Sequence, residues 1–300
     1  MKKVIVTGAS SMIASNLIKE LIADNIEVCA VVRRGSGKIK NIPESSLVHI
    51  IECDIKDLDK ADINDECAAF FHFAWAGTGG SARQDAALQS KNVEGTVKAL
   101  HLAKRCGVKV FVTAGSQAEY GAANEKLTES TPLLPETEYG KAKIKAADTA
   151  KEFCEKNNIR HIHFRILSIY GVGDNDFTMV RGAITKMLNN EDTAFTSGEQ
   201  MWDYLYAKDA ARAMLIVLNC AEQSSTFVLG SGKPEKLKEY IKIIAEETGY
   251  KKEIGFGKLP DGKIKYLCAD ISKLKSLGFE PKVDFREGIR EILCEEFKVR

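Results

Sequence analysis

The first half of the chain alternates short β-branched runs with longer segments of helical periodicity. This alternation is typical of a parallel sheet, because each parallel strand needs a crossover connection to start again at the same edge. Strand-like runs occur at 3–7, 27–32, 47–52, 68–73, 108–113 and 160–166, and the clearest helical patterns at 84–106 and 138–157. The sequence therefore predicts an α/β fold with a doubly wound parallel sheet.

The regular alternation ends at about residue 167, and loops and shorter elements follow. A chain of 300 residues is also at the size where one hydrophobic core stops growing. We expect a first domain at 1–167, to which the segment at about 204–229 also belongs. A smaller C-terminal α/β lobe is then expected from about 168–203 and 230–300.

Composition excludes several classes of partner. With 43 basic and 42 acidic residues, the chain has no electrostatic footprint for nucleic acid or an anionic membrane. It contains no apolar run of about 18 residues and no secretory leader pattern at its start. Its eight cysteines form no Cys-x-x-Cys pair and have no histidines at metal-ligand spacing, so we expect reduced thiols and no metal site. A cytoplasmic protein that binds small molecules or further copies of itself is predicted.

The turn after the first strand is placed to bind a dinucleotide. A helix N-terminus offers free N–H groups and a positive dipole end to a pyrophosphate. Gly8, Ser11 and Ala14 occupy the places of the usual three glycines, and Met12 and Ile13 open the helix. The match is partial, because Ser11 adds a side chain where the backbone approaches phosphate. An ordinary strand–helix turn is the alternative.

The end of the second strand indicates which dinucleotide is bound. An acidic residue at this place binds the ribose 2′-hydroxyl of NAD, but here the strand ends in Arg33 and Arg34. Two guanidiniums suit a 2′-phosphate, which favours NADP(H) and leaves NAD possible. A solvated basic pair is the alternative. Asp54 and Ile55, after the third strand, are expected beside the adenine.

A tyrosine and a lysine four residues apart form the candidate catalytic pair. Tyr139 and Lys143 lie at the start of a predicted helix, where this spacing puts both on one face. A nearby ammonium favours the phenolate form of a tyrosine, whose ordinary pKa is about 10. Ser116 follows an earlier strand and faces the same crevice at the carboxyl edge of the sheet.

These residues together resemble the extended short-chain dehydrogenase/reductases, and in particular the NAD-dependent epimerase/dehydratase family that acts on nucleotide sugars. The resemblance covers nearly the whole chain. Its matching positions are Thr7 and Gly8, Asp54, 72–74, 92–96, Ser116 with 120–121, Tyr139 and Lys143, Arg165 with 170–171, 202–204, Asp209, 269–273 and 277–279.

The resemblance implies a Rossmann-type cofactor domain, a substrate-binding C-terminal lobe and a role for each matching residue. Tyr139 is then the general acid/base, Lys143 orients and activates it, and Ser116 holds the reacting sugar oxygen. Phe73 and Ala74 line the cofactor, and Asn92 belongs to the cofactor site, where it supports the active-site water or the helix geometry. The expected substrate contacts are Trp75, Ser116, Gln117, Ser168 and Trp202. Ser168 stands where relatives often carry asparagine, and Trp202 where an arginine is common.

Dehydration is disfavoured, and three other functions are considered. The 4,6-dehydratases of the family carry an acidic pair after the catalytic hydroxyl, whereas this chain has Gln117 and Ala118, which cannot shuttle a proton. The arginine pair then favours an NADP(H)-dependent reductase of nucleotide-linked 4-keto sugars. A 4-epimerase with bound NAD is the alternative, and a non-catalytic NADP-binding regulator is the third. A homodimer through the helices at 84–106 and 138–157 is expected from the family.

Overall fold

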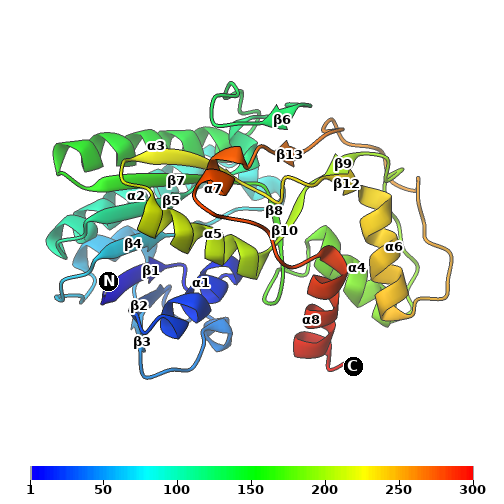
Figure 1. The fold of residues 1–300 in the computed structure, drawn as a ribbon, viewed down its shortest axis with the longest axis horizontal. Coiled ribbons are helices and arrows are strands. Elements are labelled where there is room, and N and C mark those ends of the chain that lie inside the picture. Colours follow the sequence, from blue (N-terminus) through cyan, green and yellow to red (C-terminus); the bar gives the residue numbers. More distant parts are fainter. Residues whose placement is uncertain (1, 300) are drawn as a thin grey trace.

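The computed structural model describes residues 2–299 and is built around one parallel sheet of seven strands (Figure 1). The strands are β1 (Lys3–Thr7), β2 (Glu27–Val32), β3 (Val48–Glu52), β4 (Ala69–His72), β5 (Val110–Ala114), β7 (Arg160–Ile166) and β11 (Ser225–Leu229). Their order is β11-β7-β5-β4-β1-β2-β3, and every pair is parallel. The strand order reverses between β1 and β4, which is the place where this type of sheet binds ligands.

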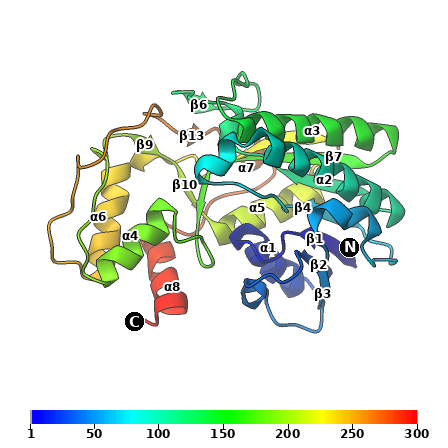
Figure 2. The same ribbon diagram turned by 180° about the vertical axis from the view of Figure 1, so that it is seen from behind.

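Helices cover both faces of the sheet. α2 (Ala86–Arg105) and α3 (Glu138–Lys156) lie side by side on one face, whereas α1 (Met12–Ala23) and α5 (Ala207–Cys220) pack together on the other (Figures 1 and 2). Alternate residues of the strands serve the two faces: Phe70 belongs to the core under α2 and α3, and Phe71 to the core under α1 and α5. The predicted Rossmann-type fold is confirmed.

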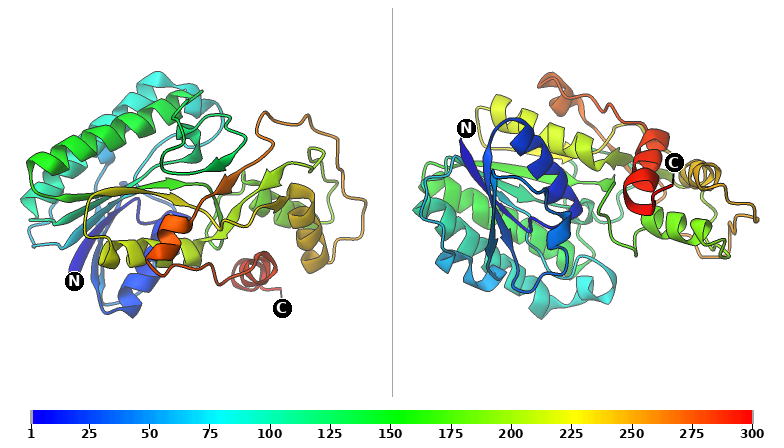
Figure 3. Two further views of the ribbon diagram at one scale, coloured as in Figure 1. Left: turned by 45° about the horizontal axis from the view of Figure 1, so that its top comes forward. Right: turned by 90° about the horizontal axis from the view of Figure 1, so that it is seen from below.

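A smaller lobe lies beyond the carboxyl edge of the sheet (Figure 3). It contains α4 (Met179–Leu188), α6 (Leu237–Thr248) and α8 (Phe285–Phe297), which enclose a core of their own. Short strand pairs join it to the first lobe: β8 (Ser168–Tyr170) with β10 (Tyr204–Tyr206), β9 (Met201–Trp202) with β12 (Glu235–Lys236), and β6 (Lys126–Leu127) with β13 (Cys268–Ala269). α7 (Ser272–Ser276) packs beside β11.

The side chain of Asp203 joins these connecting segments by hydrogen bonds. Its fully buried carboxylate accepts hydrogen bonds from the backbone N–H of Ser231 and Gly232, at 2.7 and 3.0 Å, and from that of Ala269 at 2.9 Å. Three segments that are distant in the sequence therefore meet at one side chain. This junction sets where the small lobe stands relative to the sheet.

The predicted elements agree with the structure apart from their ends. Val108 completes the turn after α2 by donating its N–H to Ala103, so β5 begins two residues later than expected. The segment at 204–229 forms β10, α5 and β11, and β11 pairs with β7 in the large sheet. The division into two domains remains our prediction. Among residues 2–299, no helix has both the length and the apolar character to cross a bilayer.

Candidate active site

The turn between β1 and α1 is shaped by a close approach of two chain segments. Gly8 has a φ of +65°, and a Cβ there would lie 2.8 Å from the backbone nitrogen of Ala74. Ser11 caps α1 by accepting a hydrogen bond from the N–H of Ala14 at 3.4 Å. The first N–H groups of a helix have no intrahelical acceptor, so those of Met12 and Ile13 face an incoming anion. The cradle therefore fits a dinucleotide pyrophosphate.

Arg33 and Arg34 are exposed directly after β2, and no acidic side chain among residues 2–299 forms an ion pair with either of them. The Asp54 carboxylate accepts the backbone N–H of Arg34 at 3.3 Å, which ties the ends of β2 and β3 together. The two guanidiniums are thus free for an anionic group. Ile55 packs against α2, where Gly95 leaves room for its side chain, and its contact with the adenine stays a prediction.

The loop after β4 is fastened to α2. Both polar atoms of the Asn92 side chain bond the backbone of Ala76 at 2.9 Å, and its amide nitrogen also reaches Gln89. These bonds fix the loop, and the place of Asn92 in the cofactor site stays a prediction. Phe73 and Ala74 lead into this loop, and the N–H of Ala74 donates to the Thr7 hydroxyl at 3.2 Å.

The three predicted catalytic residues meet at the start of α3. The Thr137 hydroxyl caps this helix by accepting the N–H of Gly140 at 3.1 Å, and Tyr139 and Lys143 are both buried on its inner face. Ser116 follows β5, and its hydroxyl lies near the Tyr139 side chain. A Cβ on Gly140 would lie 2.3 Å from the carbonyl oxygen of Ala118, so a glycine is required for this approach.

Lys143 is buried beneath Trp75. Its ammonium lies 3.6 Å from the centre of the Trp75 ring, and it donates a hydrogen bond to the carbonyl of Ala114 at 2.8 Å. Burial lowers the pKa of Lys143 to about 7, against the opposing charge of Glu119. The lysine is therefore close to losing its proton at neutral pH.

The cation nearest to the Tyr139 ring is Arg83. Its guanidinium carbon lies 4.5 Å from the ring centre, whereas the Lys143 nitrogen lies at 5.5 Å. Burial raises the pKa of Tyr139, and the neighbouring Ser116 hydroxyl and the charge of Arg83 counteract that rise. Sequence reasoning missed Arg83, because a single arginine in a glycine-rich loop carries no recognisable spacing.

The buried carboxylate of Glu119 positions Ser116. Glu119 is 1% exposed, and its carboxylate accepts the backbone N–H of Ser116 at 2.8 Å and the Arg165 Nε–H at 3.2 Å. The His163 ring nitrogen lies 3.1 Å from the same carboxylate. Burial alone raises the pKa of Glu119, but His163, the Ser116 N–H and Arg165 together hold it below its ordinary value. Glu119 is therefore a fixed negative charge.

The network continues through histidines and threonines of the neighbouring strands. The Thr113 hydroxyl lies 2.8 Å from both His161 and His163. His72 bridges the hydroxyls of Thr7 and Thr96, at 2.9 and 3.2 Å. Burial lowers the pKa of His72 and of His161 to about 3, so both rings stay neutral at physiological pH.

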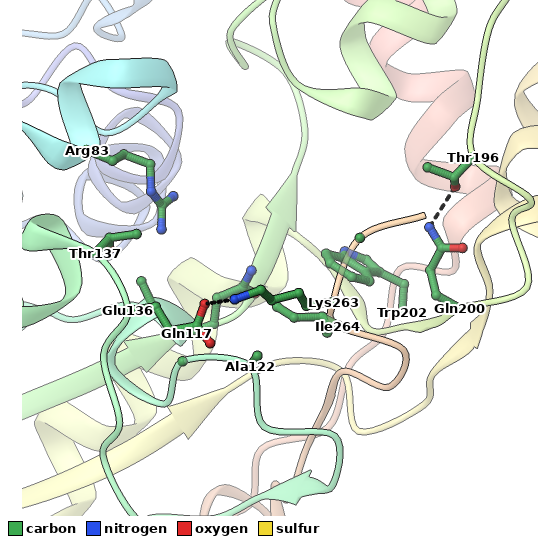
Figure 4. A pocket seen from close by; sticks show the side chains of 13 residues that line it. Arg83, Gln117, Ala122, Glu136, Thr137, Thr196, Gln200, Trp202, Lys263 and Ile264 are labelled. Carbon is green, nitrogen blue, oxygen red and sulfur yellow. Dashed lines mark hydrogen bonds and ion pairs between the residues drawn. The ribbon is translucent and has the colours of Figure 1, made fainter. Parts of the chain in front are cut away.

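A cleft of about 440 Å³ opens beside these residues, between the two lobes (Figure 4). The side chains that line it include Arg83, Gln117, Glu136, Thr137, Thr196, Gln200, Trp202, Lys263 and Ile264. Lys263 and Glu136 form an ion pair of 3.0 Å across the mouth. The Trp202 indole donates to the Ser168 hydroxyl at 2.7 Å, so these two predicted substrate contacts are joined.

Trp75 lies between α2 and the catalytic residues. Its predicted contact with the substrate stays a prediction. Its indole N–H donates to Gln89 at 2.8 Å, and its ring packs edge-on against Tyr139, with centroids 6.1 Å apart. Trp75 therefore shields Lys143, whose ammonium lies over the ring.

Comparison with known proteins finds similar sequences and folds over nearly the whole chain. The family model described as "NAD dependent epimerase/dehydratase family" matches residues 4–230. A UDP-glucose 4-epimerase of Thermotoga maritima, solved with UDP-glucose, is 26% identical, with a TM-score of 0.86 over 99% of this chain and 98% of that one. A UDP-N-acetylglucosamine 4-epimerase of Methanobrevibacter ruminantium, in complex with UDP-N-acetylmuramic acid, is 26% identical, with a TM-score of 0.89 and the same coverage. The CDP-abequose synthase of Salmonella muenchen is 26% identical over 97% of each chain.

Proposed function

The chain belongs to the NAD-dependent epimerase/dehydratase family, and from this premise we propose that it is a nucleotide-sugar 4-epimerase. One observation carries the proposal. Ser116, Tyr139 and Lys143 lie close together beside a cleft that is lined by residues of both lobes. Similar proteins that bear 4-epimerase names match the whole chain. This support makes the epimerase a stronger candidate than the 4-keto-sugar reductase that the arginine pair favours.

We propose that the cofactor lies over the β1–α1 cradle. Met12 and Ile13 would bind the pyrophosphate, and Phe73 and Ala74 would line the edge toward the active site. Arg33 and Arg34 would hold the adenosine ribose, with a 2′-phosphate if the cofactor is NADP. When bound, the nicotinamide supplies a hydride acceptor and donor at the sugar.

In this proposal Tyr139 is the general base and then the general acid. It removes the proton of the sugar O4 as the C4–H bond breaks, and it returns the proton when that bond forms again on the other face. Ser116 donates a hydrogen bond to the same oxygen and holds it beside the phenol. Arg83 and Lys143 supply the positive charge that favours the phenolate. Trp75 and the end of β5 keep water away from the ammonium.

Dehydration is not supported by this site. Elimination of water across C5 and C6 needs an acid and a base beside the sugar. Gln117 and Ala118 both line the cleft, and neither side chain transfers protons. The only carboxylate among the residues that line the cleft, Glu136, is paired with Lys263.

A nucleotide-4-keto-sugar reductase is the second candidate, and one observation favours it. Arg33 and Arg34 are exposed and unpaired at the place where a 2′-phosphate binds, which suits a dissociable NADPH. The same catalytic residues would serve both reactions, because each moves a hydride and a proton at C4.

The two candidates differ in whether cofactor is consumed. We expect purified protein with NAD to convert UDP-glucose, UDP-N-acetylglucosamine or their CDP and dTDP counterparts into C4 epimers, detected by proton NMR, without net change in cofactor absorbance. Tyr139→Phe is the matched control and should form no product. Stoichiometric loss of NADPH with a 4-keto sugar, and no epimer from any sugar, would reject the epimerase and support the reductase.

We also propose a homodimer through the outer faces of α2 and α3. The family resemblance supports it, and the two helices lie side by side on one face of the sheet, as such an interface requires. Light scattering coupled to size-exclusion chromatography tests the homodimer. A mass near 33.0 kDa indicates a monomer, and twice that value indicates the dimer.

A further inference from the structure

Arg83 is an unpaired charge at the reacting end of the cleft. Two cations line the cleft, and Lys263 is neutralised by Glu136 at 3.0 Å. Within residues 2–299, Arg83 forms no ion pair, and its one hydrogen bond to the carbonyl of Thr78 is long, at 3.4 Å. The cleft therefore carries a net positive charge, located at Arg83.

The arginine is held in place rather than loosely exposed. Gln89 of α2 donates hydrogen bonds to the carbonyls of Gly77 and Ala82, at 2.9 and 3.0 Å, which fixes the loop that carries Arg83. The guanidinium rests on the Tyr139 ring, 4.5 Å from its centre. Stacking on an aromatic face leaves the edge of a guanidinium free to form two parallel hydrogen bonds.

We propose that Arg83 binds a carboxylate on the sugar, carried by a ring carbon next to C4. The inference rests on the proposed function, because Tyr139 defines where C4 lies. The neighbours of C4 are C3 and C5, so the acid is a uronate carboxylate at C5 or an acidic ether at C3. The nucleoside diphosphate is attached to C1, across the ring from C4, and is therefore the wrong anion for a guanidinium that lies on the catalytic phenol.

The surroundings of Arg83 suit a carboxylate. Gln117 and Thr137 line the cleft beside it and offer an amide and a hydroxyl as further donors. Figure 4 shows Arg83 and Thr137 at the same end of the cleft, apart from Gln200 and Thr196 at the other. No free carboxylate lines the cleft to repel an acidic sugar, since Glu136 is paired. A bidentate guanidinium–carboxylate pair is among the stronger polar contacts in proteins.

Calorimetric binding to the full chain with NAD present tests this proposal without requiring turnover. One arm compares UDP-glucuronic acid with UDP-glucose, and the other compares UDP-N-acetylmuramic acid with UDP-N-acetylglucosamine. We expect one acidic sugar to bind roughly 10- to 100-fold more tightly than its neutral partner, the range for a charge-assisted contact. The arm that shows the preference locates the acid at C5 or at C3.

Arg83→Gln should abolish that preference, and Arg83→Lys should retain part of it. The matched control is the double variant Glu136→Gln with Lys263→Gln, which removes the other charges of the cleft without altering its net charge and should keep the preference. Equal affinity for acidic and neutral sugars in the wild type, or an equal loss for both in Arg83→Gln, overturns the proposal.

Product analysis in the same experiment separates the two proposals. Epimerisation of neutral sugars alone leaves the proposed function standing and rejects the role of Arg83. If an acidic sugar binds in a way that depends on Arg83 and no epimer forms, the proposed 4-epimerase is rejected. The proposed binding of a sugar carboxylate by Arg83 then stands.

Discussion

Replacing Glu119 by glutamine removes the buried charge beneath Ser116 while keeping the size of the side chain. Its oxygen can still accept the N–H of Ser116, but its amide then presents donors to the Arg165 Nε–H, which lies 3.2 Å from the carboxylate, and to His163 at 3.1 Å. Removing one partner of a buried ion pair costs about 3–5 kcal/mol. Arg165 keeps a hydrogen bond of 2.9 Å to the carbonyl of Glu129, so we expect the lower end, about 3 kcal/mol.

Urea unfolding at pH 7, followed by circular dichroism, measures this loss. The matched control is Glu138→Gln, which breaks the partly exposed pair of Glu138 with Lys141 and should change the unfolding free energy by no more than about 0.5 kcal/mol. A change below about 1 kcal/mol for Glu119→Gln would refute the argument that the network is held by this charge.

The same network sets a pH dependence. The pKa of Glu119 is held below its ordinary value in the folded protein. Its contribution to stability is therefore complete above the unfolded pKa of about 4.3 and is lost as the pH falls through the folded value. The difference in stability between wild type and Glu119→Gln should shrink in acid, and a difference that grows there would contradict the assignment.

Three further substitutions test the site. Tyr139→Phe should lower turnover by about 10²–10⁴-fold and leave the melting temperature and cofactor affinity close to wild type, because only the proton-transferring hydroxyl is removed. Lys143→Met should abolish turnover and yet raise the unfolding free energy at pH 7, since a folded pKa of about 7 means that the unfolded state binds the proton more tightly. That gain should disappear as the pH rises toward the ordinary lysine pKa, and a gain independent of pH would contradict it. Gly8→Ala should destabilise the protein by more than about 1 kcal/mol in urea and weaken cofactor binding, because its Cβ would lie 2.8 Å from the Ala74 nitrogen in a left-handed conformation.

The centre of the sheet could be predicted because β1, β2, β4 and β5 are mostly apolar runs, buried on both faces. Phe70 and Phe71 belong to opposite cores, and this two-sided burial gives a local signal that needs no knowledge of partners. The small lobe gave no comparable signal. Its strand pairs have two or three residues each, and they are set by long-range contacts such as those of Asp203, which no spacing in the sequence reveals.

Within the site, residues on regular elements were predictable and those that act through tertiary contacts were not. Tyr139 and Lys143 share a helix face, so their spacing alone brought them together. Glu119 could not be singled out from the sequence, because its partners His163 and Arg165 come from a strand more than 40 residues away. The bonds of Asn92 to the loop after β4 and of Trp75 to α2 could not be predicted either, because they also join distant segments.

The charges around Tyr139 are divided between two side chains that respond differently to pH. Lys143 is buried, with a pKa lowered to about 7, so its positive charge fades as the solution becomes alkaline. An arginine guanidinium stays protonated throughout this range. Arg83, which lies closer to the ring than Lys143, therefore maintains the field on the phenol where the lysine loses it. The same guanidinium faces the cleft without an acidic partner, and an acidic sugar would neutralise it only when bound. While such a sugar is bound, the contribution of Arg83 to the phenolate would be reduced, and Lys143 would be the remaining cation beside Tyr139.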